Sequence, residues 1–256
     1  MNDSKSSSID TNLPTYTCRI CTQETPVYQV SMFDAIEFLS CQHCGSITTT
    51  PIPPEQEITE ALNDSHYASR GVFSLARDKK HFIKHLNDLD HMTKGTKAID
   101  LLCRNGYRVE LARMNGFKDA IGIDTNKYCI EVANARFSKT NVKQMDLASL
   151  IKTGETYDVI FCVHGLEQTG DPDAYLQNIK KITHDKSLVY FSQTDGNHFM
   201  TPNALLRWKE IIYPERIHYI SRVGLDALLK RNGFKTLKRY IRFLPYQHVI
   251  TRPLKP

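Results

Sequence analysis

The sequence has no hydrophobic run long enough to cross a membrane, and its first eight residues, MNDSKSSS, are almost entirely polar. A transmembrane helix needs about 20 apolar residues, and a secretory signal needs an apolar core of about 7–15 residues near the start. Because neither pattern occurs, we predict a cytoplasmic protein without a membrane partner. The scarcity of apolar residues over 1–15 predicts a disordered leader.

A strong excess of charge is also missing. The 256 residues carry 33 lysines and arginines against 28 acids, a net charge of +5, and 41% of them are hydrophobic. This composition is typical of a globular protein with one substantial core and room for a small module. Six basic residues cluster towards the C-terminal end, and the aromatics among them do not form a recognisable RNA-binding pattern: Lys230, Arg231, Lys235, Lys238, Arg239 and Arg242. We therefore favour a solvated face over a nucleic-acid partner, and nothing in the sequence indicates the oligomeric state.

Four of the seven cysteines form two C-x2-C pairs separated by nineteen residues: Cys18, Cys21, Cys41 and Cys44. This spacing predicts a tetrahedral zinc site built from two knuckles. Two disulfides are the alternative, which a reducing cytosol disfavours. Four thiolates leave no open position on the metal, so we predict a structural Zn²⁺ ion that stabilises a zinc ribbon over residues 16–52.

The ribbon is expected to contain a hairpin. Val27–Val30 and Ile36–Leu39 have strand-forming composition, which predicts two strands that bring the cysteine pairs together. Prolines then separate the ribbon from two predicted helices, Glu55–Ser69 and Phe73–Met92. These helices form a predicted linker or lid over residues 53–95.

The stretch Ala98–Asp124 has the pattern of a strand, a tight loop, a helix and a second strand. An apolar run that contains Asp100 begins it, helical spacing stops at Gly116, and a second apolar run ends at Asp124. Open parallel sheets bind nucleosides at the carboxyl ends of their strands, where an acidic residue accepts hydrogen bonds from the ribose hydroxyls. The sequence therefore predicts a site beside Asp100 and Asp124.

Strands and helices continue to alternate towards the C-terminal region. Strands are predicted at Val142–Asp146, Tyr157–Val163 and Lys186–Gln193, with a closing antiparallel pair at Lys235–Phe243 and Tyr246–Thr251. The second of these is almost continuously apolar, as expected of a parallel strand covered on both faces. The alternation predicts an α/β fold.

The loop that follows the apolar run at Ala98 resembles the first motif of class I S-adenosylmethionine (SAM) methyltransferases, D-x-G-x-G-x-G. Asp100 and Gly106 fit this motif, whereas Leu102 and Arg104 replace two of its glycines. The resemblance implies a seven-stranded Rossmann-like sheet over residues 96–256, with helices on both faces.

The same resemblance implies which residues contact the cofactor. It assigns the ribose to Asp124, the adenine to the vicinity of Asp146, the methionine pocket to Asp100 and Gly106, and an aromatic lid to Tyr67. Two of these residues have simpler alternatives. Asp146 could cap the helix that follows it, and Tyr67 could simply pack in the core.

The segment His164–Pro172 resembles the fourth methyltransferase motif, a strand followed by Leu-Glu-His and an Asp-Pro helix start. Gln168 replaces the histidine, and a glutamine cannot exchange a proton near neutral pH. His164, at the carboxyl end of the strand, is the available substitute as a catalytic base. The alternative is that His164 has no catalytic role.

A stretch that begins at Tyr213 resembles a Tyr-His-Glu-His motif of zinc-ribbon methyltransferases acting on nucleotide-linked sugars. Tyr213 and Glu215 match it, which implies catalytic roles for both, whereas Pro214 and Arg216 replace the two histidines. In that subfamily the second histidine is thought to deprotonate the substrate, and Arg216, which stays protonated, cannot do so. Tyr213 and Arg216 are expected to edge the acceptor pocket together with Trp208.

The predicted function is SAM-dependent methyl transfer to a small-molecule acceptor, such as a sugar, a quinone-like phenol or a carboxylate. The resemblance is to zinc-ribbon sugar methyltransferases and ubiquinone-type O-methyltransferases. Substitutions at Leu102, Arg104, Gln168 and Arg216 raise the alternative of a catalytically silent, methyltransferase-like scaffold whose zinc module or basic surface binds a partner. A nicotinamide-dependent oxidoreductase fits poorly, because residues 102–107 offer one glycine where G-x-G-x-x-G needs three.

Overall fold

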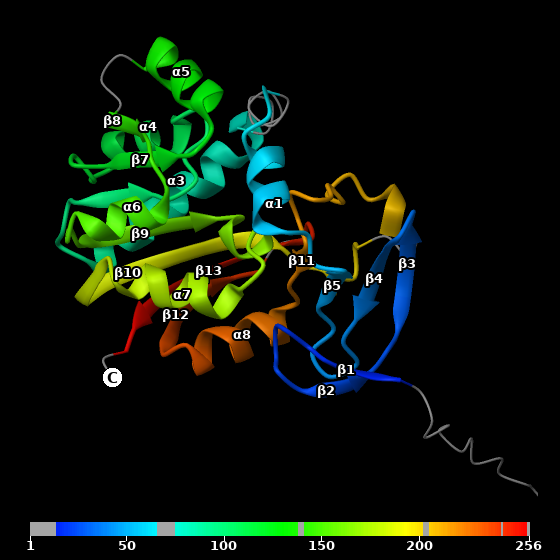
Figure 1. Ribbon diagram of the computed structural model, residues 1–256. Coiled ribbons are helices and arrows are strands. Elements are labelled where there is room, and N and C mark those ends of the chain that lie inside the picture. Colours follow the sequence, from blue (N-terminus) through cyan, green and yellow to red (C-terminus); the bar gives the residue numbers. More distant parts are fainter. Residues whose placement is uncertain (1–13, 66–74, 138–140, 202–204, 242, 255–256) are drawn as a thin grey trace, which may run out of the picture.

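The computed structural model describes residues 14–65, 75–137, 141–201, 205–241 and 243–254. Its centre is a seven-stranded sheet with the order β12-β13-β10-β9-β6-β7-β8 (Figure 1). The strands from β6 to β10 are parallel, whereas β13 is antiparallel to both β10 and β12. The strands span Ala98–Asp100 (β6), Ile121–Asp124 (β7), Asn141–Gln144 (β8), Tyr157–Val163 (β9), Thr183–Thr194 (β10), Phe234–Tyr240 (β12) and Tyr246–Pro253 (β13). The predicted Rossmann-like sheet with its closing antiparallel pair is confirmed.

Helices cover both faces of this sheet, as predicted. The helices α3 (Leu75–Met92), α4 (Tyr107–Met114) and α5 (Lys127–Arg136) pack on one face, and α6 (Leu147–Lys152), α7 (Pro172–Lys180) and α8 (Arg222–Arg231) pack on the other. None of the helices in the described ranges is long and apolar enough to cross a membrane.

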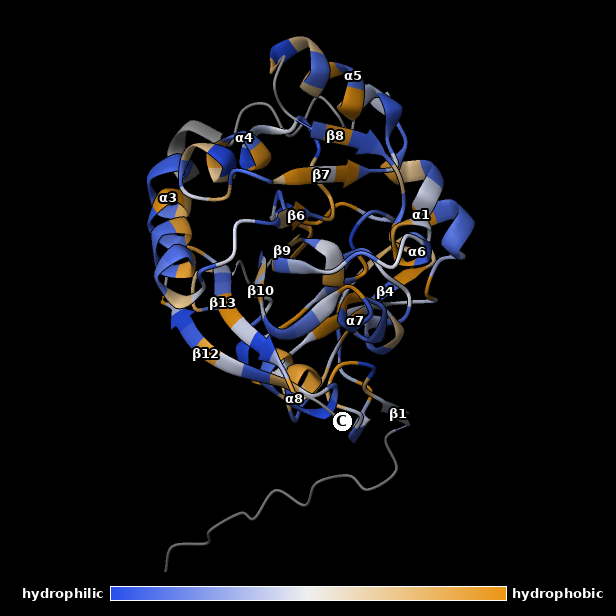
Figure 2. Cartoon of the chain, turned by 90° about the vertical axis from the view of Figure 1, so that its left-hand side faces the viewer, coloured by the Kyte–Doolittle hydropathy of each residue, from blue (hydrophilic) through white to orange (hydrophobic). Residues whose placement is uncertain are grey.

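Strand β9 shows how one apolar run serves both faces. Val159 and Phe161 contact the core beneath α3, α4 and α5, whereas Ile160 and Cys162 contact the core beneath α6, α7 and α8. Successive side chains of a strand point to opposite faces. A strand that is buried on both faces is therefore apolar at successive positions and not only at every second one. The neighbouring strands β6 and β7 are correspondingly hydrophobic at the centre of the sheet (Figure 2).

The N-terminal part forms two small sheets beside the large one (Figure 1). A two-stranded sheet pairs β1 (Thr15–Thr17) with β2 (Glu24–Pro26), and a four-stranded sheet has the order β11-β5-β4-β3. Its strands are β3 (Gln29–Phe33), β4 (Ile36–Ser40), β5 (Ile47–Thr50) and β11 (His218–Tyr219), and helix α1 (Glu55–Leu62) follows β5 in the chain. The predicted hairpin is therefore present as β3 and β4. The fourth strand, β11, comes from a distant part of the sequence, so the ribbon sheet is completed by the C-terminal half of the chain.

Trp208 belongs to a small core beneath this four-stranded sheet. Its side chain is 6% exposed, and its ring lies 5.7 Å from that of Tyr219, measured between centroids. Phe38 and Ile47 of the ribbon sheet complete the cluster. Trp208 therefore provides an apolar cover on this face of the ribbon sheet, and its place at the edge of an acceptor pocket stays a prediction.

Helix α8 holds the ribbon against the main domain. Ser221 caps the helix by accepting a hydrogen bond from the Gly224 amide, and its hydroxyl also donates to the carbonyl oxygen of Cys44. At the other end of α8, Arg231 donates to the carbonyl oxygens of Arg19 and Ile20 in the first cysteine knuckle. A Cβ atom at Gly224 would lie 2.2 Å from the Ser46 hydroxyl oxygen and 2.8 Å from Ile20 Cγ2. The close approach of helix and ribbon therefore requires glycine at this position.

His218 is a fully buried titratable group in the strand that joins the ribbon sheet to the main domain. Its Nδ1 lies 3.2 Å from the Thr48 hydroxyl, whereas its Nε2 is buried and has no hydrogen-bond partner in the described part of the chain. Burial, reinforced by the nearby charge of Arg19, lowers the pKa of His218 to about 4. The imidazole is therefore neutral in the folded protein at pH 7.

Gly224→Ala is expected to destabilise the protein by about 1–3 kcal/mol, the usual cost of overpacking a filled site. Alanine normally favours a helix by up to about 1 kcal/mol over glycine, so the clash must outweigh that gain. Urea unfolding measures the change. Gly170→Ala is the matched control, because its Cβ would lie 3.5 Å from Ile52 Cγ2, an ordinary contact. Equal stabilities of the two variants would contradict this account of α8.

Acidification is expected to weaken the folded state through His218. A depressed folded-state pKa means that the unfolded chain binds the proton more readily, so stability falls as the pH drops below the unfolded pKa of 6.5. Between pH 7 and pH 5 this group alone costs about 2 kcal/mol. His218→Gln, which cannot be protonated, should lose about that much less stability over the same interval in urea unfolding. An identical loss in both proteins would refute the assignment.

Candidate active site and metal centre

The four predicted zinc ligands come together at the two turns of the ribbon. The Sγ atoms of Cys18, Cys21, Cys41 and Cys44 all lie within 4.8 Å of one another. Cys18 and Cys44 are 3.9 Å apart, and Cys21 and Cys41 are 3.6 Å apart. Zn–S bonds of about 2.3 Å in a tetrahedron place sulfurs about 3.8 Å apart, so the cluster has the dimensions of a zinc site with four cysteine ligands.

The loop between β6 and α4 keeps a glycine-type backbone although two glycines of the motif are replaced. Arg104 has φ +48° and Gly106 has φ +71°, both in the left-handed region. A left-handed conformation costs a non-glycine residue about 1–2 kcal/mol, so the loop imposes it on Arg104. Leu102 and Arg104 are both half-buried. Gly106 is the residue from which α4 begins, without a side-chain cap.

Asp124 ends β7 next to this loop, as predicted. Its Oδ2 accepts a hydrogen bond from the Arg104 amide at 2.8 Å, and its Oδ1 accepts one from the Asn126 amide at 2.9 Å. The residue is only 2% exposed, and burial raises the pKa of its carboxyl although both amides oppose the shift. A carboxylate oxygen accepts two hydrogen bonds, so each oxygen retains capacity for a further donor such as a ribose hydroxyl.

Asp100, at the end of β6, is neutralised within the protein. Arg108 of α4 donates from Nε to Oδ2 at 2.9 Å and from Nη2 to Oδ1 at 3.3 Å, and it also donates to the Leu102 carbonyl at 2.5 Å. Asp100 is 1% exposed. The pair holds the loop in shape, and contact of Asp100 with a cofactor stays a prediction. Sequence reasoning missed Arg108, because a single arginine in the first turn of a helix looks the same as any solvated one.

Two further cofactor predictions have mixed outcomes. Asp146 is exposed and caps α6, since its Oδ1 accepts a hydrogen bond from the Ser149 amide at 2.6 Å. The capping alternative is thus confirmed, and proximity to an adenine stays a prediction. Tyr67 lies outside the described residues.

His164 lies at the carboxyl end of β9, where the predicted site requires it. Its Nδ1 is 2.5 Å from Oε2 of Glu167, and its backbone adopts φ +64°. The side chain of His164 retains 22% exposure, whereas Glu167 is fully buried. Burial lowers the pKa of His164, an effect that Glu167 partly offsets and that the charges of Arg216 and Arg104 reinforce. The imidazole is therefore neutral at pH 7 and able to accept a proton.

Arg216 lies beside the same carboxylate, Glu167. Its Nε lies 3.7 Å from Oε2 of Glu167, and its Nη1 donates to Oε2 of Glu210. Tyr246 donates to the other oxygen of Glu210 at 2.5 Å. The carboxylates that Arg216 faces, those of Glu167 and Glu210, belong to the protein itself. Arg216 thus balances buried charge and does not edge an open pocket.

Tyr213 and Glu215 come from the same segment as Arg216. Tyr213 is half-buried within electrostatic reach of Glu57 on α1, and burial raises the pKa of its hydroxyl. Glu215 is 6% exposed. Their predicted catalytic roles stay predictions.

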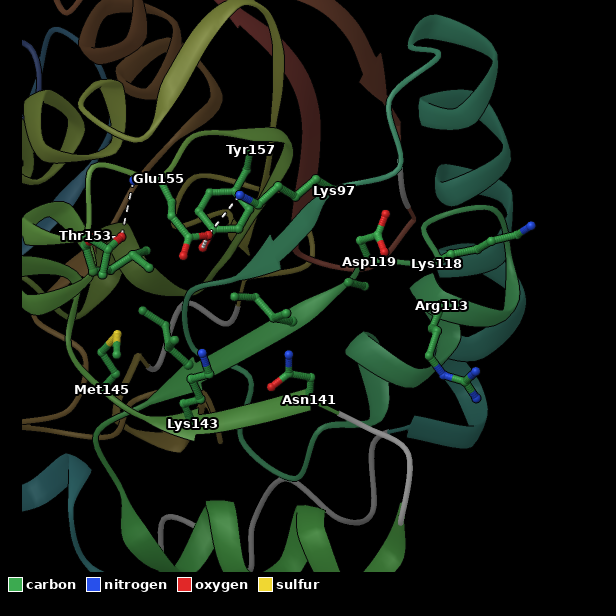
Figure 3. Close-up of a pocket in the computed structure, with 14 residues that line it drawn as sticks. Lys97, Arg113, Lys118, Asp119, Asn141, Lys143, Met145, Thr153, Glu155 and Tyr157 are labelled. Atoms are coloured by element: carbon green, nitrogen blue, oxygen red, sulfur yellow. Dashed lines mark hydrogen bonds and ion pairs between the residues drawn. The ribbon is translucent and has the colours of Figure 1, made fainter.

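A cavity of about 490 Å³ lies elsewhere, at the amino ends of the parallel strands (Figure 3). It is lined by residues that begin strands or precede them, among them Lys97, Ile121, Asn141 and Tyr157. Lys97 pairs there with Glu155 at 2.9 Å. Ligands of open α/β sheets bind at the carboxyl ends instead, so this cavity is separate from the candidate active site.

Solved structures share the fold of this chain at low sequence identity. The magnesium protoporphyrin IX methyltransferase of Synechocystis PCC 6803, solved with bound SAM, is 14% identical, with a TM-score of 0.53 over 80% of this chain and 99% of that chain. The cyclase SpnF is 12% identical, with a TM-score of 0.52 over 68% of this chain and 82% of that chain. The fold therefore occurs in proteins named for different reactions.

Sequence comparisons identify the family. A ubiquinone biosynthesis O-methyltransferase of Aliivibrio fischeri (strain ATCC 700601 / ES114) is 30% identical over 108 residues, which are 40% of this chain and 46% of that protein. The chain thus spans about half the length of the curated relatives it matches. The family model described as "Methyltransferase domain" matches residues 71–239, more than half of the chain. The protein belongs to this methyltransferase-domain family.

Proposed function

We propose that this protein is a SAM-dependent methyltransferase that transfers a methyl group to a hydroxyl oxygen of a small molecule. One observation carries the proposal: a neutral histidine with an ionised partner lies at the same edge of the sheet as the Asp124 loop. The carboxyl ends of β6, β7 and β9 meet there. A donor bound at the loop and an acceptor bound at the histidine would therefore be neighbours, and alignment of the reactants supplies much of such catalysis.

The residues present fit the cofactor by their donor and acceptor chemistry. Asp124 retains acceptor capacity for ribose hydroxyls, and Gly106 allows backbone to approach a ligand closely. The guanidinium of Arg104 lies within electrostatic reach of Asp124 and His164, where it could attract the carboxylate of the methionine moiety. Bound SAM would supply an electrophilic methyl group on a sulfonium.

The acceptor is then deprotonated by the protein. His164 takes the hydroxyl proton on its Nε2 while the oxygen attacks the methyl carbon, so the new O–C bond forms as the O–H bond breaks. General-base assistance of this kind contributes about 10²–10⁴-fold. The relatives named as ubiquinone biosynthesis O-methyltransferases support an acceptor oxygen.

A catalytically silent scaffold is the second candidate. The ion pair between Asp100 and Arg108 supports it, because that carboxylate is already neutralised inside the protein. Cofactor binding separates the two candidates, since a scaffold with a filled loop would bind neither SAM nor its product.

Calorimetric titration with S-adenosylhomocysteine should give saturable heat for the wild-type protein. Asp124→Asn should weaken this binding at least about tenfold, which equals a loss of about 1.4 kcal/mol. Both carboxylate oxygens accept hydrogen bonds from backbone amides. The NH₂ group of the asparagine must therefore face one of these N–H donors, which disturbs the loop. Asp119→Asn is the control, because Asp119 is exposed and lies at the opposite edge of the sheet. Absence of heat with wild type at millimolar ligand would sink the proposal in favour of the silent scaffold.

We also infer that the cysteine cluster holds one structural Zn²⁺ ion. Metal analysis should find about one zinc per chain, and Cys44→Ser should lower this content, whereas Cys129→Ala on α5 should leave it unchanged. Removal of the metal by a chelator should shift the emission of Trp208, the one tryptophan, to longer wavelength, because its core is built on the ribbon sheet. A metal-free protein with unchanged tryptophan emission would contradict the inference.

A further inference from the structure

The carboxylate of Glu167 is held rigidly on both of its oxygens. Oε1 accepts hydrogen bonds from the Thr194 amide at 2.7 Å and from the Thr194 hydroxyl. Oε2 faces His164 Nδ1 at 2.5 Å and Arg216 Nε at 3.7 Å. The backbone is fixed as well, because the Glu167 carbonyl accepts a hydrogen bond from the Ile217 amide at 2.9 Å. The carboxylate therefore cannot rotate without breaking several contacts.

Glu167 is ionised in this environment, which determines the direction of its bond to His164. Burial works against the charge, but His164 and Arg216 outweigh it and lower the pKa of Glu167 to about 2. An ionised carboxylate only accepts hydrogen bonds. His164 must then donate from Nδ1, which leaves the lone pair on Nε2. Within the described residues Nε2 has no hydrogen-bond partner, and the side chain is 22% exposed.

The charges around His164 favour its taking up a proton during the reaction. Two buried carboxylates, of Glu167 and Glu210, contact the single guanidinium of Arg216. This cluster is one positive charge short of neutrality until His164 is protonated. Burial, reinforced by the charges of Arg216 and Arg104, lowers the pKa of His164, so the imidazole is neutral at rest.

We propose that Glu167 is the positioning residue of a histidine base: it fixes His164 in the Nδ1–H tautomer and stabilises the imidazolium that forms when Nε2 accepts the acceptor's proton. This role rests on the proposed methyl transfer. The acceptor O–H bond breaks as the O–C bond forms, the C–S bond breaks to give the thioether, and the imidazolium then releases its proton to water. Arg216 stands at the sequence position of the histidine base in the resembling subfamily, and both Arg216 and His164 face Oε2 of Glu167, so the carboxylate now serves a base that comes from the end of β9.

The tautomer of His164 tests this role without a known acceptor. In protein labelled with 15N-histidine, the shifts of the two ring nitrogens distinguish Nδ1–H from Nε2–H, and His164→Asn assigns the signals among the ten histidines. Wild type should show Nδ1–H. Glu167→Gln should show Nε2–H, because the two donors of Thr194 keep the amide oxygen at the Oε1 position. The amide NH₂ then faces Nδ1 and requires it to accept. The variant should also titrate at a lower pH, since the negative charge that raises the His164 pKa is gone.

Titration with S-adenosylhomocysteine separates this proposal from the proposed function and also checks folding. Glu167→Gln should bind it within about twofold of wild type, because Glu167 holds the base and not the cofactor. A wild-type Nε2–H tautomer would overturn the role of Glu167 whatever the cofactor does, and that measurement does not depend on the stability of the Glu167 variant. Retention of Nδ1–H in folded Glu167→Gln would overturn it as well. Failure of the wild-type protein to bind S-adenosylhomocysteine would instead count against methyl transfer.

Discussion

The buried carboxylate of Glu167 is the constraint on which the candidate site depends. Removing a carboxylate from water costs several kcal/mol unless charged and hydrogen-bonding partners replace the solvent. The partners here come from three parts of the chain: His164 after β9, Thr194 at the end of β10, and Arg216 before β11. The ends of β9 and β10 and the long segment after β10 are thereby all held by contacts with the Glu167 carboxylate. The adjacent bond from Ile217 leads directly into β11 and so into the ribbon sheet.

The substituted β6 loop shows that a motif can change its residues and keep its geometry. Arg104 adopts the left-handed conformation that glycine would take without strain, and its amide still bonds to Asp124. The backbone therefore retains the shape of a nucleotide-binding loop. The charge beside the loop has changed instead, since the guanidinium of Arg104 lies within electrostatic reach of Asp124. Fold similarity does not show what this change in charge does to function, because function depends on the chemistry of the site.

The sequence predicted the elements of this fold well, because they are encoded locally. Alternating apolar runs located the parallel strands, and cysteine spacing located the four-cysteine cluster. The candidate site was predicted in part: Asp124 and His164 followed from their places at strand ends. Glu167, Thr194 and Arg108 were missed as partners, because periodicity reports which face a residue occupies and not which distant residue it meets. The apolar neighbours of Trp208 were missed for the same reason, since they lie in the ribbon sheet.

Strand β11 has a consequence for how the chain folds during synthesis. The hydrogen bond between Thr48 and His218 closes a separation of 170 residues. The hairpin of β3 and β4 and the two cysteine knuckles leave the ribosome long before β11, the last strand of their sheet, is translated. Contacts so distant in sequence form slowly and after local ones. The hairpin and the knuckles are therefore translated well before the strand that completes their sheet.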